Sequence, residues 1–175
     1  MKLTFVERIR SLSQEPHATV KKIGVSEGQN VADIGAGLGY FTIPAAIVVG
    51  QTGLVYSVEP NPARSDRIRD RVAAEGLENV RVLTTGAERL GDIPTGSVDL
   101  AFSAFSMHHF NDMQAGIAEI RRILRNGGRF YVWDRVPGLI MKHGTRPQEL
   151  DRFSGGFTKF ELLSTGRTVK ARFTK

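Results

Sequence analysis

The stretch VADIGAGLGYFT at 31–42 holds the residues whose types and spacing point most directly to chemistry. Apolar residues surround Asp33, a pattern typical of a buried strand that carries the acid to its carboxyl end. Alternating glycines follow it: Gly35, Gly37 and Gly39. Glycine permits positive φ and close backbone approach to a ligand, and the N–H groups opening a helix over 40–49 would face the same ligand.

A second acid follows at the expected distance. The apolar run LVYSVEP contains Glu59, twenty residues after Gly39. Doubly wound sheets place a carboxylate at this strand end, where it accepts hydrogen bonds from ribose hydroxyls. Two other interpretations stay open: Glu59 as a solvated strand-end acid, and Asp33 as a turn-stabilising carboxylate, which is compatible with ligand binding.

The turn differs from a dinucleotide fingerprint. The G-x-G-x-x-G pattern needs its third glycine at position 40, where Tyr40 stands. Asp33 would also repel a pyrophosphate. S-adenosylmethionine (SAM) has no phosphate and carries an ammonium and a sulfonium, so these residues favour SAM as the ligand.

These motifs resemble those of class I SAM-dependent methyltransferases, whose first motif D/E-x-G-x-G-x-G stands here at 33–39. The similarity extends to Glu59-Pro60, to SVDLAFSAFSMHHF at 97–110 and to RRILRNGGRFYVWD at 121–134. It covers roughly residues 20–174 and is closest to the small ubiquinone/menaquinone-type and type 11 methyltransferases.

The resemblance implies a Rossmann-like α/β fold, with a seven-stranded sheet flanked by helices and a C-terminal antiparallel strand pair. It also implies a set of SAM-binding residues: Asp33, Gly35, Ala36, Gly37, Gly39, Tyr40, Glu59, Pro60, Gly86, Ala87, Glu88 and Ser103. The family's adenine-binding Asp is absent from Thr85-Gly86-Ala87-Glu88, so we expect adenine to contact backbone around Gly86 and Ala87, or Glu88. Asn126 replaces the usual proline of the later turn.

The pattern along the chain alternates helices with strands, as a parallel sheet requires. We expect strands at about 30–34, 54–58, 80–84, 98–103 and 129–133, and a final strand pair joined at 165–166. Helices are expected near the N-terminus (Phe5, Val6, Ile9, Leu12), at 18–23, from Asn61-Pro62 to Gly76, at 112–125 before Gly127, and at 147–153. Val169, Ala171 and Phe173 should share one face.

Two histidines follow the fourth strand, near the mouth of the expected site. We interpret His108 as a candidate general base, because imidazole accepts protons near neutral pH. The alternative is that one of His108 and His109 fixes the loop while the other faces solvent. Asp134, after the fifth strand, would meet substrate or cap the next segment. The histidine pair is a poor metal site because adjacent side chains diverge, so no metal is expected.

Composition restricts the remaining possibilities. The length of 175 residues predicts a single domain over 1–175, which the resemblance implies is a methyltransferase domain. Without cysteine, neither disulfides nor thiolate sites are possible. No secretory signal or apolar run of about 20 residues occurs, so we expect a cytoplasmic protein without a membrane span. With 24 basic and 18 acidic residues the net charge is +6, which makes nucleic acid a possible partner, although solvated arginine faces are the simpler interpretation.

The sequence therefore predicts a SAM-dependent methyltransferase whose acceptor enters over the carboxyl ends of strands four and five and is a small organic molecule. The short segments flanking the core leave little for a lid, so we expect an open or partner-completed site. RNA or protein methylation, and a SAM-binding module without catalysis, remain alternatives, with a dehydrogenase as a third. The acceptor atom and oligomeric state do not follow from the residues.

Overall fold

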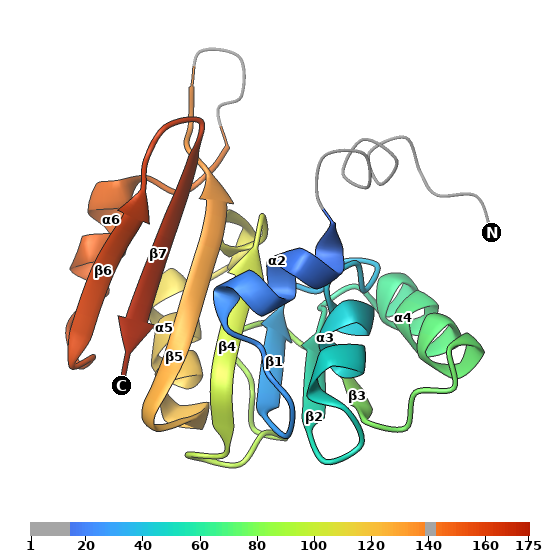
Figure 1. Ribbon diagram of the computed structural model, residues 1–175. Coiled ribbons are helices and arrows are strands. Elements are labelled where there is room, and N and C mark those ends of the chain that lie inside the picture. The colour runs from blue at the N-terminus through green and yellow to red at the C-terminus, as the bar shows by residue number, and fades with distance from the viewer. Residues whose placement is uncertain (1–14, 139–142) are drawn as a thin grey trace.

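The computed structural model describes residues 15–138 and 143–175, which build a seven-stranded sheet with helices on both faces (Figure 1). The strands are β1 (Asn30–Ile34), β2 (Leu54–Val58), β3 (Val80–Leu83), β4 (Val98–Ala104), β5 (Leu124–Arg135), β6 (Lys159–Ser164) and β7 (Thr168–Thr174). The helices are α2 (Pro16–Ile23), α3 (Thr42–Val49), α4 (Pro62–Ala74), α5 (Met113–Ile123) and α6 (Pro147–Arg152), with a 3-10 turn, η1 (Met107–His109).

The strand order is β3-β2-β1-β4-β5-β7-β6, and the five strands from β3 to β5 run parallel. β7 pairs antiparallel with both β5 and β6, so the predicted C-terminal antiparallel pair is confirmed. The chain proceeds outward from β1 to β3 and then returns to β4 on the other side of β1. Ligands bind at such a switch point, because the connections leave neighbouring strands in opposite directions and open a crevice.

The two faces of the sheet carry separate apolar cores. The helices α2 and α3 lie on one face, and α5 and α6 on the other (Figure 1). Val169, Ala171 and Phe173 of β7 are fully buried beneath the second pair, as their alternation predicts, while the residues between them are half-buried. Within the described residues, none of the helices is long and apolar enough to span a membrane.

The junction of α5 and β5 differs from the prediction of a helix over 112–125. The helix ends at Ile123, and Leu124 adopts extended backbone as the first residue of β5, paired with Val98. Leu124 is fully buried in the core. Its apolar side chain fits the spacing of the helix's buried face, but it is buried as part of the strand. The following residues form an irregularity, with Gly127 at φ 74°, before β5 pairs regularly with β4.

Other boundaries agree within about two residues. The helix expected over 40–49 begins at Thr42, and that expected at 18–23 begins at Pro16. Helix α4 has Asn61 as its N-cap, and the Asn61 side chain accepts from the Arg64 N–H at 3.2 Å. Gly76 follows this helix with φ of 63°. The expected N-terminal helix lies outside the described residues.

The start of α5 offers a test of this local architecture. The Asp112 side chain accepts from the Ala115 N–H at 3.0 Å and so caps the helix. We expect Asp112→Ala to lower the free energy of unfolding by about 1 kcal/mol, measured by urea denaturation. Asp66→Ala is the control, because its ion pair with Arg69 is exposed and such pairs contribute little. Equal losses in both variants would contradict the capping role.

Candidate active site

The turn after β1 is shaped by its three glycines. Gly35, Gly37 and Gly39 have φ of 77°, 62° and 74°, the left-handed region that favours glycine. A Cβ on Gly35 would also overlap the Ser106 side chain, whereas one on Gly37 would meet nothing within 4 Å. The turn is therefore restricted by backbone conformation at all three positions and by a close neighbour at the first.

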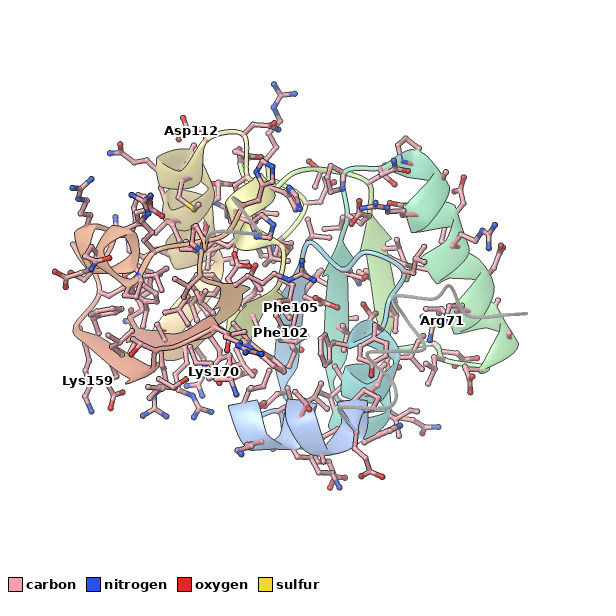
Figure 2. The ribbon with its side chains drawn as sticks, turned by 90° about the horizontal axis from the view of Figure 1, so that it is seen from above. Arg71, Phe102, Phe105, Asp112, Lys159 and Lys170 are labelled. Carbon is pink, nitrogen blue, oxygen red and sulfur yellow. The ribbon has the colours of Figure 1, made fainter. Side chains whose placement is uncertain are left out.

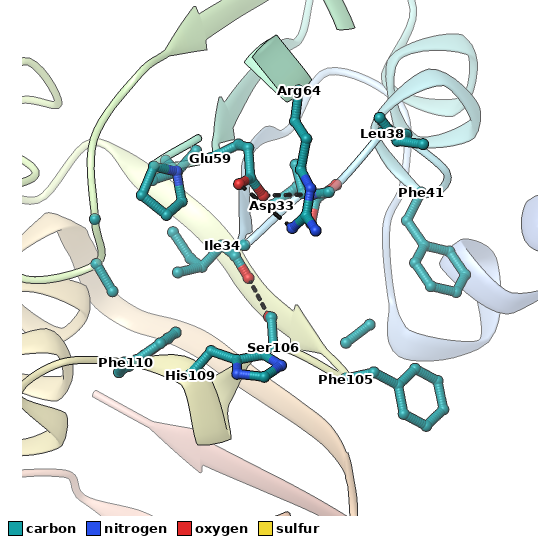
Figure 3. A pocket seen from close by; sticks show the side chains of 18 of the residues that line it. Asp33, Ile34, Leu38, Phe41, Glu59, Arg64, Phe105, Ser106, His109 and Phe110 are labelled. Atoms are coloured by element: carbon teal, nitrogen blue, oxygen red, sulfur yellow. Dashed lines mark hydrogen bonds and ion pairs between the residues drawn. The ribbon is translucent and has the colours of Figure 1, made fainter. Parts of the chain in front are cut away.

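Glu59 ties this turn to the end of β2. Its carboxylate is 3% exposed and accepts from the Gly37 N–H at 2.8 Å and the Asn61 N–H at 3.0 Å. An Arg64 guanidinium nitrogen lies 3.8 Å away, and Figure 3 shows this side chain reaching toward the carboxylate. A carboxylate oxygen has more than one acceptor position, so Glu59 retains capacity for a ligand hydroxyl.

Asp33 lies beneath the turn at 2% exposure. Its Oδ2 accepts from the Thr42 hydroxyl at 2.7 Å, and that hydroxyl also shares a hydrogen bond with Ser57. Burial raises the pKa of Asp33 from 3.8 to about 7, the Thr42 hydrogen bond opposes the rise, and the Glu59 charge adds to it. Asp33 is thus poised between its neutral and ionised forms at neutral pH.

A cavity of about 750 Å³ opens at the carboxyl ends of β1, β2 and β4. The sequence-predicted residues that line it are Asp33, Gly35, Ala36, Gly37, Tyr40, Glu59, Pro60, Gly86, Ala87 and Glu88. Three predicted residues are not among the lining residues: Gly39, Ser103 and His108. The lining residues that were not predicted are Ile34, Leu38, Phe41, Val58, Arg64, Ala104, Phe105, Ser106, His109, Phe110 and Asn111. Most of these residues are next to a predicted residue in the sequence, and this adjacency is the signal that could have identified them.

The loop after β4 forms the opposite wall of the cavity (Figure 3). The Ser106 hydroxyl donates to the Ile34 carbonyl at 2.7 Å and shares a 2.7 Å hydrogen bond with Ser103, which is fully buried. Ser103 thus supports Ser106 by its side chain. Phe105 has φ of 58°, and a non-glycine residue in this region marks local strain of the kind found at binding sites.

The segment after β3 supplies the remaining side. Gly86, Ala87 and Glu88 line the cavity, and the Glu88 carboxylate accepts from the Asp112 N–H at 3.1 Å. The expected adenine contacts with these three residues stay a prediction, and their position along one wall is compatible with it.

The two histidines have different surroundings. The Nδ1 of His108 lies 2.8 Å from an Asp134 oxygen, and its backbone N–H donates to the same carboxylate at 3.1 Å. Asp134 is fully buried and also accepts from the Thr145 hydroxyl at 2.8 Å, so it joins the loop to the later chain. Asp134 therefore anchors the loop after β4 to the end of β5 through His108. The catalytic role of His108 stays a prediction.

His109, in contrast, lines the cavity. Burial lowers the pKa of His109 below its usual range, and the neighbouring His108 lowers it further. The two rings lie 4.0 Å apart between centroids. Within the described residues, no group of three or more His, Asp or Glu side chains could hold a metal ion.

A doubly wound sheet, with a glycine turn and a buried acid at adjoining strand ends, defines a Rossmann-like domain with a cavity at that edge of the sheet. More particularly, the methyltransferase domain family model matches residues 32–132, and the chain belongs to this family. Its cavity is large enough for SAM, since ligand pockets of 300–1,000 Å³ are usual.

Individual relatives agree with this assignment. Aklanonic acid methyltransferase DauC of Streptomyces sp. (strain C5) is 33% identical over 58% of this chain and 46% of that protein. The ubiquinone/menaquinone biosynthesis C-methyltransferase UbiE of Saccharophagus degradans is 28% identical over 84% of this chain and 56% of its own length. The chain thus spans about half the length of these curated relatives. A SAM-dependent methyltransferase from Aquifex aeolicus shares the fold, with a TM-score of 0.75, 22% identity and 96% coverage of both chains.

The raised pKa of Asp33 predicts a pH-dependent stability. Between pH 3.8 and about 7 the unfolded state has lost this proton and the folded state retains it, so stability falls as pH rises through that window. The full effect is at most roughly 4 kcal/mol, three pKa units. We expect the stability of the protein relative to Asp33→Asn to decline across this range in chemical denaturation.

The control for that experiment is Asp66→Asn, whose side chain is 71% exposed. Its stability relative to the parent protein should stay nearly constant with pH. Parallel stability curves for the parent protein and Asp33→Asn would contradict the proposed titration.

The different partners of the two histidines predict different effects on folding. His108→Ala removes a side-chain donor from the fully buried Asp134 and should lower the free energy of unfolding by about 1–3 kcal/mol. His109→Ala should cost less, because its ring lines an open cavity. Thermal denaturation of both variants makes the comparison, and a larger loss in His109→Ala would refute it.

Proposed function

We propose that this chain is a SAM-dependent methyltransferase domain that acts on a small organic acceptor. The observation that carries the proposal is the Gly37 N–H bond to buried Glu59 on the wall of one large cavity. The names of DauC and UbiE, both methyltransferases of small molecules, support the same activity and the same class of acceptor.

Each wall of the cavity has a proposed role in holding the cofactor. The glycine turn admits the methionine end, and Asp33 holds its ammonium through the turn backbone or water. Glu59 accepts from the ribose hydroxyls, and the backbone around Gly86 contacts adenine. Tyr40, which lines the cavity at the end of the turn, packs beside the methionine end.

Bound SAM supplies a methyl group on a positively charged sulfur that is already a good leaving group. The contribution of the chain is therefore alignment and exclusion of water from an in-line displacement. Ser106 fixes the β4 loop against the turn through the Ile34 carbonyl, so the two sides of the cavity keep a fixed separation. Where the acceptor must lose a proton, His109 lines the cavity and its lowered pKa favours the neutral, proton-accepting form.

Glu59→Gln tests the cofactor site. The amide retains one acceptor oxygen but loses the charge that strengthens hydrogen bonds to ribose. We expect calorimetry to show SAM affinity reduced by roughly 10- to 100-fold, corresponding to the loss of about 1.5–3 kcal/mol. Glu75→Gln, at an exposed residue beyond α4, should leave affinity unchanged. Unaltered binding in Glu59→Gln would overturn the ribose assignment.

Turnover distinguishes an enzyme from a binding module. Methyl-labelled SAM would be incubated with the chain and pooled small-molecule extracts, and formation of S-adenosylhomocysteine would be followed together with label transfer. Parallel incubations would contain RNA and protein fractions in place of the small-molecule extract. We expect label to enter the small-molecule fraction. Transfer to the RNA or protein fraction alone would overturn the proposed acceptor class, and binding without any turnover would overturn the enzymatic activity.

A further inference from the structure

Three strands at one end of the sheet have a face that none of the described helices covers. On this side α2 and α3 lie over β4, β1 and β2, whereas β5, β7 and β6 continue beyond them (Figure 1). The other face of the same three strands is packed in the core, where Phe130, Val132 and Val169 are fully buried. The uncovered face is therefore available to a partner.

Strand register decides which side chains belong to the uncovered face. Alternate residues along a strand, and residues directly opposite each other in neighbouring strands, project to the same side of a sheet. Lys170 and Arg172 alternate with buried residues on β7, and both Tyr131 of β5 and Glu161 of β6 are opposite Arg172. We call this surface the basic sheet face, and its charged and aromatic members are Arg129, Tyr131, Trp133, Arg135, Lys159, Glu161, Lys170 and Arg172.

Positive charge dominates the basic sheet face, because five of its members are basic and one is acidic. The acid, Glu161, is shared by two cations: the Lys159 Nζ lies 2.9 Å from one carboxylate oxygen and the Arg172 Nη2 lies 2.8 Å from the other. One carboxylate cannot neutralise two cations, so even this paired group keeps a net positive charge.

Two further cations of this face have no acidic partner among the described residues. The Lys170 Nζ lies 4.5 Å from the Trp133 ring centroid, and an Arg129 guanidinium nitrogen lies 3.5 Å from the Gly24 carbonyl. An ammonium has three donors and a guanidinium has five, so both groups keep donors for a ligand. Figure 2 shows Lys159 and Lys170 on the side of the sheet where α2 lies. The charge complements a polyanion that lies along the strands.

The shape of the face favours a single-stranded nucleic acid among polyanions. Lys170 and Arg172 lie about 7 Å apart along β7, so a regularly charged chain can follow the strand. Tyr131 is half-buried and opposite Arg172, which places an aromatic ring beside a cation. Proteins bind single strands with cations on the backbone and aromatic rings on the bases. A broad sheet does not enter a duplex groove, which takes a helix or a two-stranded ribbon.

We propose that the basic sheet face binds single-stranded nucleic acid, with phosphates on Arg129, Lys170 and Arg172 and a base stacked on Tyr131. The strand is a binding partner held outside the cavity, because none of the residues that define this face lines it. The inference goes beyond the proposed function and does not depend on it.

The test uses a labelled oligothymidylate of about 12 nucleotides, within the usual site size of such surfaces. Fluorescence anisotropy gives its affinity, and the emission of Trp133, the single tryptophan of the chain, reports where it binds. We expect saturable binding that weakens as salt rises and changes Trp133 emission, because the strand engages the ammonium over that ring. Absence of binding at low salt, or binding that leaves the emission unchanged, would overturn the proposal.

Lys170→Gln combined with Arg172→Gln removes two phosphate contacts. We expect the affinity to fall about tenfold or more, and the slope of log affinity against log salt to become shallower by about 1.4, since each phosphate contact to a single strand contributes about 0.7. The control, Arg81→Gln with Arg152→Gln, changes net charge equally at exposed residues of β3 and α6. Equal losses in the two double variants would indicate general charge attraction and refute the assigned face.

Lys170→Gln alone serves where the double variant does not fold, because it leaves the ion pairs of Glu161 intact. Its salt slope should become shallower by about 0.7. Arg81→Gln alone is then the control, and an equal change of slope in both would refute the contact.

Tyr131→Leu keeps an apolar side chain and removes the aromatic ring. Its affinity should fall about tenfold, as for the loss of one stacked base, with the salt slope unchanged. Full affinity in this variant would overturn the stacking role. Poly-glutamate and phosphatidylglycerol vesicles provide the comparison with other polyanions. Tighter binding of either one than of oligothymidylate would assign the face to an acidic protein or a lipid surface and overturn the proposal.

Discussion

The hydrogen bond from the Gly37 N–H to the buried Glu59 carboxylate is the constraint on which the site depends. It joins the turn after β1 to the end of β2, where the Gly35 and Ala36 N–H groups also donate to the Val58 carbonyl. A buried carboxylate is stable only when donors surround it, so Glu59 requires the turn to present Gly37 in this orientation. The left-handed glycines are the residues that permit it.

This arrangement concentrates negative charge where no described metal-binding cluster lies. The raised pKa of Asp33 is one response, because burial and the Glu59 charge both oppose its ionisation. A cation bound beside these acids would favour the ionised form of Asp33, so their charge favours a cationic ligand.

The sequence was sufficient for features that depend on neighbours in the chain. The glycine turn, both acids, most strands and the N-cap at Asn61 follow from local residue types and spacing. The end of α5 was predicted wrongly because Leu124 satisfies the helical stripe, yet its burial comes from pairing with Val98, 26 residues earlier. Likewise, the orientation of His108 depends on Asp134, 26 residues later. The sequence around the two adjacent histidines does not indicate which of them faces the cavity.

The loop after β4 shows how such distant partners prepare a site. Three of its four residues from 105 to 108 are held by hydrogen bonds: the Phe105 N–H donates to the Trp133 carbonyl, the Ser106 hydroxyl to the Ile34 carbonyl, and His108 pairs with Asp134. These partners lie on β5, on β1 and again at the end of β5, so the loop is held against the sheet on both sides. The strained backbone of Phe105 can persist because its neighbours fix it. Since this wall of the cavity is bound to both strands that neighbour β4, the sheet itself holds in place the side chains that the wall presents to a ligand.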